Sequence, residues 1–90
     1  MMIWKYSLKI TDFQTLSMPV GAKVLSLHLQ HGCPQLWALV DEGGPQELRT
    51  FTTIGTGNPI PSELKLGAFI GTYLARGDAV VFHVFEVEPT

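Results

Sequence analysis

Apolar and polar residues alternate with a period of two along much of this chain. Between Trp4 and Ile10 every even-numbered residue is apolar and every odd-numbered residue is polar. Successive side chains of a β-strand point to opposite faces, so this segment is predicted to form a half-buried strand. Its inward side chains would be Trp4, Tyr6, Leu8 and Ile10. A turn at Thr11–Asp12 would then lead into a return strand from Gln14 to Met18.

Three more strands are predicted in the middle of the chain. Ala22 to Gln30 alternates again, and one face of this strand would carry Leu25, Leu27 and Leu29. Leu36 to Val40 is almost wholly apolar, which is typical of a strand covered on both faces. Glu47 to Ile54 is rich in Thr and Phe, which suit a pleated surface. Turn residues at 31–34 and 41–45 separate these strands.

The C-terminal third contains a long loop and a hairpin. Residues 55–65 include two glycines and two prolines, and we expect at most one short helical turn there, at 61–64. Ala68–Leu74 and Ala79–Val87 are apolar runs around a short turn that contains glycine, which is the pattern of a β-hairpin. Residues 1–90 are therefore predicted to form a single all-β domain, a mostly antiparallel barrel or sandwich of about seven strands.

The composition limits the classes of function. The chain is 46% hydrophobic and 16% charged, so some apolar surface would remain uncovered in a monomer and we expect a homo-oligomer. The net charge is −2 and the six basic residues form no cluster, which argues against general nucleic-acid binding. No segment approaches the roughly 20 apolar residues of a transmembrane helix, so we expect no membrane association.

Several short segments carry a resemblance to a known family. IWKY near the start, LWALVD, a GTG loop and VFHVFE near the end occur in this order. This pattern resembles a family of short uncharacterised proteins of tailed phages and prophages, over nearly the whole chain. The resemblance implies a phage accessory protein in the host bacterial cytoplasm, and it assigns no catalytic residue.

The GTG loop allows two interpretations. Glycines after a strand can cradle an anion with backbone amides, and a ligand site there would comprise Gly55, Thr56, Gly57 and Asn58, with Arg49 or Lys65 as charge partners. A phosphate-binding fingerprint, however, needs a third glycine or a Gly-Lys pair and a following helix, and the chain has none of these here. A simple bend at the end of a strand is the favoured interpretation.

Metal binding and catalysis find little support in the sequence. His28, His31 and Cys33 are zinc-type ligands, but their spacing is not that of a structural zinc site. The same residues are the sole candidates for a Cys–His catalytic pair, and no nucleophile motif surrounds them. We therefore expect a non-enzymatic protein without a metal or a cofactor.

The last strand is apolar on both faces. Such a strand aggregates if one face is left in water, so it is either central in its sheet or covered by a second subunit. The residues expected at an oligomer interface are Val80, Phe82, Val84 and Phe85.

Together these patterns predict a self-associating binding module for a host or phage protein. An oligomeric protein that sequesters a nucleotide-type ligand is one alternative, and a minor virion component is another.

Overall fold

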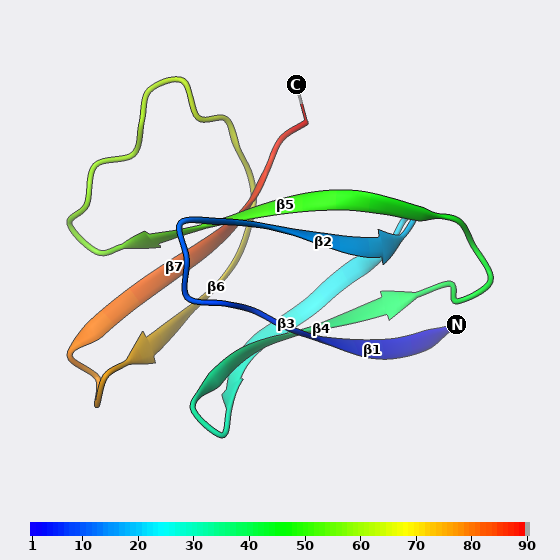
Figure 1. Ribbon diagram of the computed structural model, residues 1–90, viewed down its shortest axis with the longest axis horizontal. Coiled ribbons are helices and arrows are strands. Elements are labelled where there is room, and N and C mark those ends of the chain that lie inside the picture. Colours follow the sequence, from blue (N-terminus) through cyan, green and yellow to red (C-terminus); the bar gives the residue numbers. More distant parts are fainter. Residues whose placement is uncertain (90) are drawn as a thin grey trace.

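The chain folds into two antiparallel β-sheets, and the computed structural model describes residues 1 to 89. The strands are β1 (Met2–Ser7), β2 (Phe13–Pro19), β3 (Lys23–Gln30), β4 (Cys33–Val40), β5 (Gln46–Gly55), β6 (Leu66–Ala75) and β7 (Val80–Val87). One sheet has the order β1-β4-β3 and the other the order β2-β5-β7-β6 (Figure 1). The prediction of an all-β fold of about seven strands is confirmed, and the architecture is a small sandwich rather than a closed barrel.

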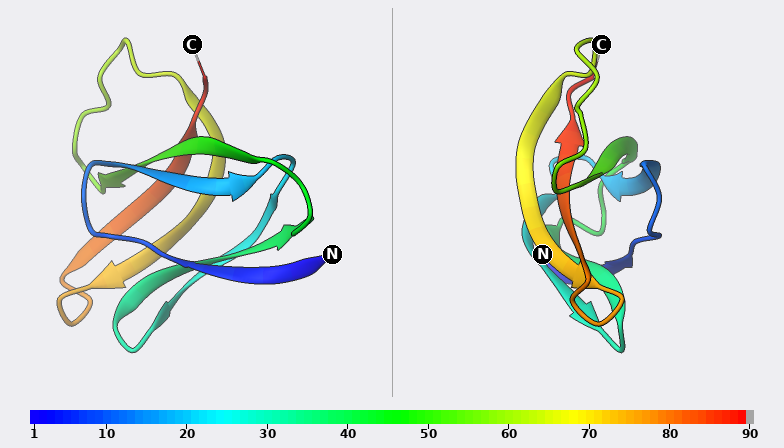
Figure 2. Two further views of the ribbon diagram at one scale, coloured as in Figure 1. Left: turned by 45° about the vertical axis from the view of Figure 1, so that its right-hand side comes forward. Right: turned by 90° about the vertical axis from the view of Figure 1, so that its left-hand side faces the viewer.

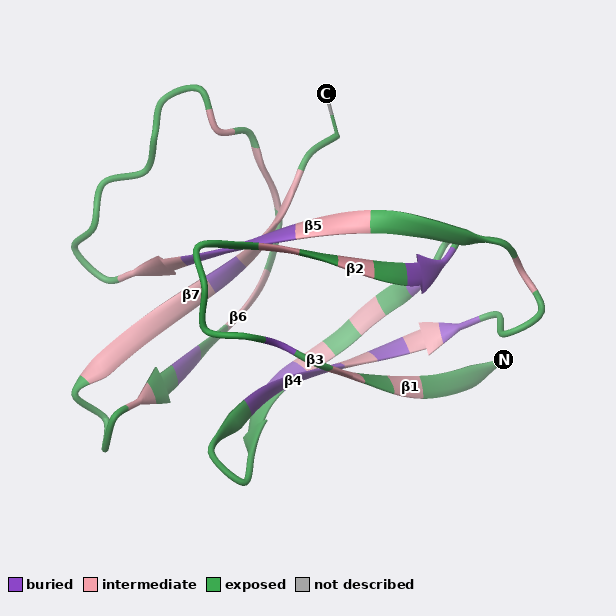
Figure 3. Cartoon of the chain, viewed as in Figure 1, coloured by how far each residue is buried: buried purple, intermediate pink, exposed green. Residues whose placement is uncertain are grey.

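The two sheets share one apolar core. Its fully buried side chains come from β2, β4, β5 and β7 and include Met18, Leu36, Val40, Phe51 and Val84 (Figure 3). The strand expected at 36–40 is found as β4, the middle strand of its sheet, with Leu36, Ala38 and Val40 buried on its inner face. Trp37 and Leu39 on the other face are half-buried, so the expected cover on both faces is not complete. The molecule is flat, with dimensions of 40 × 34 × 16 Å (Figure 2). A core this thin covers one face of each sheet.

The sheets approach each other closely where β3 meets β6. Gly71 of β6 lies against Leu27 of β3, and a Cβ added at Gly71 would stand 3.1 Å from Leu27 Cβ. Glycine is needed at this point because a side chain would push the two strands apart.

Three residues that the alternation placed on inward faces, Ile10, Leu25 and Leu29, are exposed instead. Ile10 lies beyond the end of β1, because the Gln14 side-chain amide pairs with both the N–H and the C=O of Lys9 and turns the chain early. Leu25 lies at a shift in register between Val24 and Ser26, which turns it away from the core.

The last strand, β7, occupies the interior of the four-stranded sheet between β5 and β6. The core of the chain covers the inner face of this strand, with Val84 fully buried, whereas Val81, Phe85 and Val87 lie on its outer face, outside the core. Residues 61–64 form a single hydrogen-bonded turn, in which Leu64 N–H donates to the Pro61 carbonyl. Among the described residues, no helix has the length and apolar character needed to cross a membrane.

The close contact at Gly71 generates a stability prediction. Gly71→Val should destabilise the fold by about 1–3 kcal/mol, because the added methyl groups overpack the contact with Leu27. Urea unfolding measures this change. The control is Gly43→Val in the loop between β4 and β5, where an added Cβ has its nearest neighbour at 3.8 Å. Equal stability of the two variants would contradict the assigned role of Gly71.

Candidate functional site

The GTG loop is a tight turn fixed to β7. Gly57 has a φ of +86°, and Asn58 N–H donates to the Gly55 carbonyl at 3.1 Å, as in a type II turn with glycine at its third position. Thr56 N–H donates to the Val81 carbonyl of β7, also at 3.1 Å. The amides of Thr56 and Asn58 thus already have acceptors in the chain. The geometry favours the bend over an anion cradle.

Gly55 has a separate steric role. A Cβ added at this position would lie 2.8 Å from Asn58 Nδ2, which is closer than Cβ contacts normally occur. Gly55 therefore leaves room for the Asn58 side chain of the same loop, which packs closely against the Gly55 backbone. Gly55 and Asn58 both line a cavity.

A short row of polar side chains holds the loop to the sheet. The His83 ring of β7 lies between two hydroxyls, with Nε2 2.7 Å from Thr56 Oγ1 and Nδ1 2.9 Å from Thr72 Oγ1. Hydroxyls both donate and accept, so they satisfy both ring nitrogens of a neutral imidazole. The row joins the GTG loop to β7 and β6.

Arg49 does not face the GTG loop. Its Nε and Nη2 each donate to a Glu86 carboxylate oxygen at 2.7 Å, and Nη1 donates to the Ala22 carbonyl. The hydrogen bonds from Arg49 to Glu86 raise the pKa of the guanidinium. This bidentate pair links β5, β7 and the turn before β3, so the expected ligand role of Arg49 is corrected to a structural one. Lys65 lies at the other end of the long loop, where its carbonyl accepts from Glu88 N–H.

The three zinc-type residues are spread over a hairpin. His28 lies beside Trp37, with ring centroids 6.2 Å apart, whereas His31 is in the turn and Cys33 is exposed. Within residues 1 to 89, no group of three His, Cys, Asp or Glu side chains is placed to hold a metal ion.

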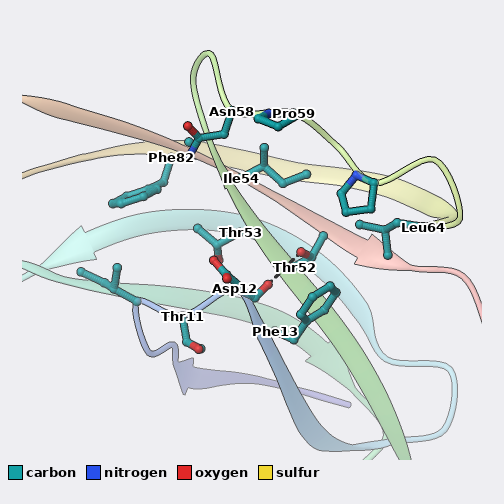
Figure 4. A pocket seen from close by; sticks show the side chains of 13 residues that line it. Thr11, Asp12, Phe13, Thr52, Thr53, Ile54, Asn58, Pro59, Leu64 and Phe82 are labelled. Carbon is teal, nitrogen blue, oxygen red and sulfur yellow. Dashed lines mark hydrogen bonds between the residues drawn. The ribbon is translucent and has the colours of Figure 1, made fainter.

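A cavity of about 390 Å³ lies beside the end of β5. Its walls come from the turn after β1, from the last residues of β5 and from the long loop (Figure 4). Apolar side chains contribute much of the wall, namely Ile10, Phe13, Ile54, Pro59, Leu64 and Phe82. Asp12 is the one charged residue among those that line it. Sequence reasoning missed this cavity, because residues 10–13, residues 52–64 and Phe82 are far apart in the chain and come together only in the fold.

The outer face of the four-stranded sheet carries no Asp, Glu, Lys or Arg among the residues that the strand register places there. These residues are Phe13, Thr15, Ser17, Pro19, Gln46, Leu48, Thr50, Thr52, Ile54, Leu66, Phe69, Thr72, Leu74, Val81, His83, Phe85 and Val87. We call this surface the uncharged face. Leu48, Phe69 and Leu74 are 75%, 58% and 40% exposed on it. By contrast, the outer face of the three-stranded sheet carries Lys5 and Lys23.

The expected oligomer interface divides between the two faces of β7. Val84 is fully buried and Phe82 packs against the core, with Tyr73 as its aromatic neighbour. Val80 shares this inner face by strand alternation. Of the four expected residues, Phe85 alone lies on the uncharged face, and it pairs there with Phe69. For Val84 the expectation was wrong, because the strand is central and its inner face fills the chain's own core.

The Arg49–Glu86 pair should contribute strongly to stability. Arg49→Met should cost about 3 kcal/mol, because it leaves the Glu86 carboxylate largely buried without its partner. The double variant Arg49→Met/Glu86→Leu should regain much of this loss. Urea unfolding measures all three free energies. The control is Glu42→Gln, which removes the exposed pair with the N-terminus and should change stability by less than about 1 kcal/mol. An Arg49→Met variant as stable as this control would contradict the assignment.

Comparison with known proteins places the chain in a family. The model of the family described as "Domain of unknown function (DUF7352)" matches residues 1–90. No curated protein and no solved structure matches the chain. The family description assigns no activity, so a function has to be argued from the geometry. The match spans the whole sequence, and the chain therefore belongs to the DUF7352 family.

Proposed function

We propose that this protein is a non-enzymatic binding module that self-associates through the uncharged face. The observation that carries the proposal is the lack of any Asp, Glu, Lys or Arg on that face, combined with exposed Leu48, Phe69 and Leu74. Large exposed apolar areas on small soluble proteins are typical of contact surfaces. The sequence resemblance to phage proteins supports the context, which is a phage or prophage accessory protein that binds a host or phage protein.

The chemistry of the uncharged face favours a second copy of the chain as its occupant. In a two-fold symmetric dimer the same patch contacts itself, so a charge close to the symmetry axis meets its own image. A face without formal charge avoids this repulsion, and its threonine hydroxyls can pair with each other. Thr15 Oγ1 and Thr50 Oγ1 already lie 3.3 Å apart across β2 and β5.

The Phe69–Phe85 pair is the natural centre of the contact. The two rings lie side by side on β6 and β7 with their centroids 5.2 Å apart and an interplanar angle of 58°. Aromatic side chains bury a large area for little loss of rotamer freedom, and they dominate the energetics of many interfaces. Phe69 is more than half exposed in the single chain, so contact with a second copy would bury additional apolar area of its ring.

Substitution of Phe69 by Glu tests the proposal. We expect the wild-type chain to show a mass above that of the monomer in size-exclusion chromatography with light scattering. Phe69→Glu should weaken the association by at least about tenfold, because it buries a carboxylate without a partner. Circular dichroism should remain that of the folded protein.

The matched control is Ile3→Glu. Ile3 is 60% exposed and lies on an edge strand, as Phe69 does, but on the outer face of the three-stranded sheet. This variant should associate like the wild type. A wild-type monomer at all concentrations, or an equal loss of association in both variants, would show that the uncharged face is not the contact surface.

A further inference from the structure

The end of β5 has a free edge. β5 pairs with β2 from Gln46 to Thr52, but it pairs with β7 as far as Gly55. The last contact on this side is made by Asp12, whose carbonyl accepts from Thr53 N–H, and no residue before Asp12 pairs with the end of β5 in the described part of the chain. The cavity lies on this side of the strand.

Strand alternation identifies the backbone groups on the free edge. Thr56 N–H donates to β7, whereas Thr53 N–H donates to the Asp12 carbonyl on the opposite side. Residues two apart on a strand direct their backbone groups to the same side, so Gly55 also faces the free edge. The Gly55 carbonyl accepts from Asn58 N–H. The Thr53 carbonyl and the Gly55 N–H have no partner on this side within the described part of the chain.

An acceptor and a donor two residues apart are what an added strand pairs with. In strand addition an extended peptide forms main-chain hydrogen bonds to a free edge, and pockets for its side chains give specificity. A cavity of about 390 Å³ with apolar walls has room for an apolar side chain of such a peptide. The long loop and the turn at residues 10–13 form the two banks of the groove (Figure 4).

The charge of the groove restricts the occupant further. The Asp12 carbonyl accepts bonds from Thr53 N–H and Thr52 Oγ1, but its carboxylate makes no hydrogen bond or ion pair within residues 1 to 89. No cationic side chain lines the cavity. A ligand with a positive group is thus favoured over an anion such as a nucleotide.

We propose that this groove binds an extended segment of a partner protein by strand addition. One apolar side chain of the segment fills the cavity, and a Lys or Arg side chain next to it pairs with Asp12. This inference rests on the proposed binding function and gives the partner its chemistry, while the groove uses a different part of the molecule from the Phe69–Phe85 pair.

Two synthetic peptides test the proposal by NMR titration of the full chain. The probe is acetyl-Lys-Val-Phe-Val-Lys-amide, and its counterpart has Glu in place of both Lys residues. The basic peptide should shift the amide signals of Thr53 and Gly55, with a Kd in the millimolar range or below. Methylation of the backbone nitrogen of its Phe should weaken binding, because this nitrogen would lose its hydrogen. Equal binding of the acidic peptide, or no shift with either, would overturn the proposal.

A pair of variants locates the charge contact. Asp12→Asn should weaken the affinity for the basic peptide by about fivefold to tenfold, because the substitution removes the one carboxylate that lines the groove. Asp78→Asn makes the same change of charge in the turn between β6 and β7 and should leave binding unchanged. Equal effects of the two substitutions would refute a role for Asp12.

Light scattering on the same samples separates this inference from the proposed function. Self-association without peptide binding would reject the groove alone. Peptide binding by a strict monomer would reject the contact at the uncharged face and leave the groove in place.

Discussion

A thin sandwich of two small sheets can bury only one face of each sheet. The chain fills the space between them with one core, to which β2, β4, β5 and β7 contribute the largest side chains. Both outer faces are then left to solvent or to a partner. The outer face of the three-stranded sheet carries Lys5, which bonds to Gln30, and Lys23, whereas the other face carries hydroxyls and apolar groups. This unequal division of charge is the basis of the functional proposal.

Alternation in the sequence was enough to predict the strands, because burial on one face repeats every second residue. The alternation gave the wrong face at two places. At Lys9 the side-chain amide of Gln14 takes the backbone hydrogen bonds that a neighbouring strand would form, and at Leu25 the strand register shifts. Neither feature can be read from the order of apolar and polar residues in the sequence. The candidate site is less predictable, because nearness in sequence suggests Arg49 as a charge partner of the GTG loop, whereas its guanidinium bonds to Glu86 in the structure.

The glycine loop connects the two proposed surfaces. Its Thr56 bonds to His83 on the uncharged face, while Gly55 and Asn58 line the groove at the end of β5. Phe13, Thr52 and Ile54 belong to the uncharged face and also line the cavity. Self-association and the capture of an extended segment would therefore occur on adjacent surfaces of the same sheet, joined by one hydrogen-bonded turn.

The central claim is that the uncharged face is where two copies meet. The most direct measurement is a dilution series of the isotope-labelled protein followed by amide chemical shifts. Shifts that change with concentration should cluster on β6 and β7, around Phe69, Leu74 and Phe85, and the signals of β1, β3 and β4 should stay unchanged. Concentration-dependent shifts on the three-stranded sheet instead, or none at any concentration, would contradict it.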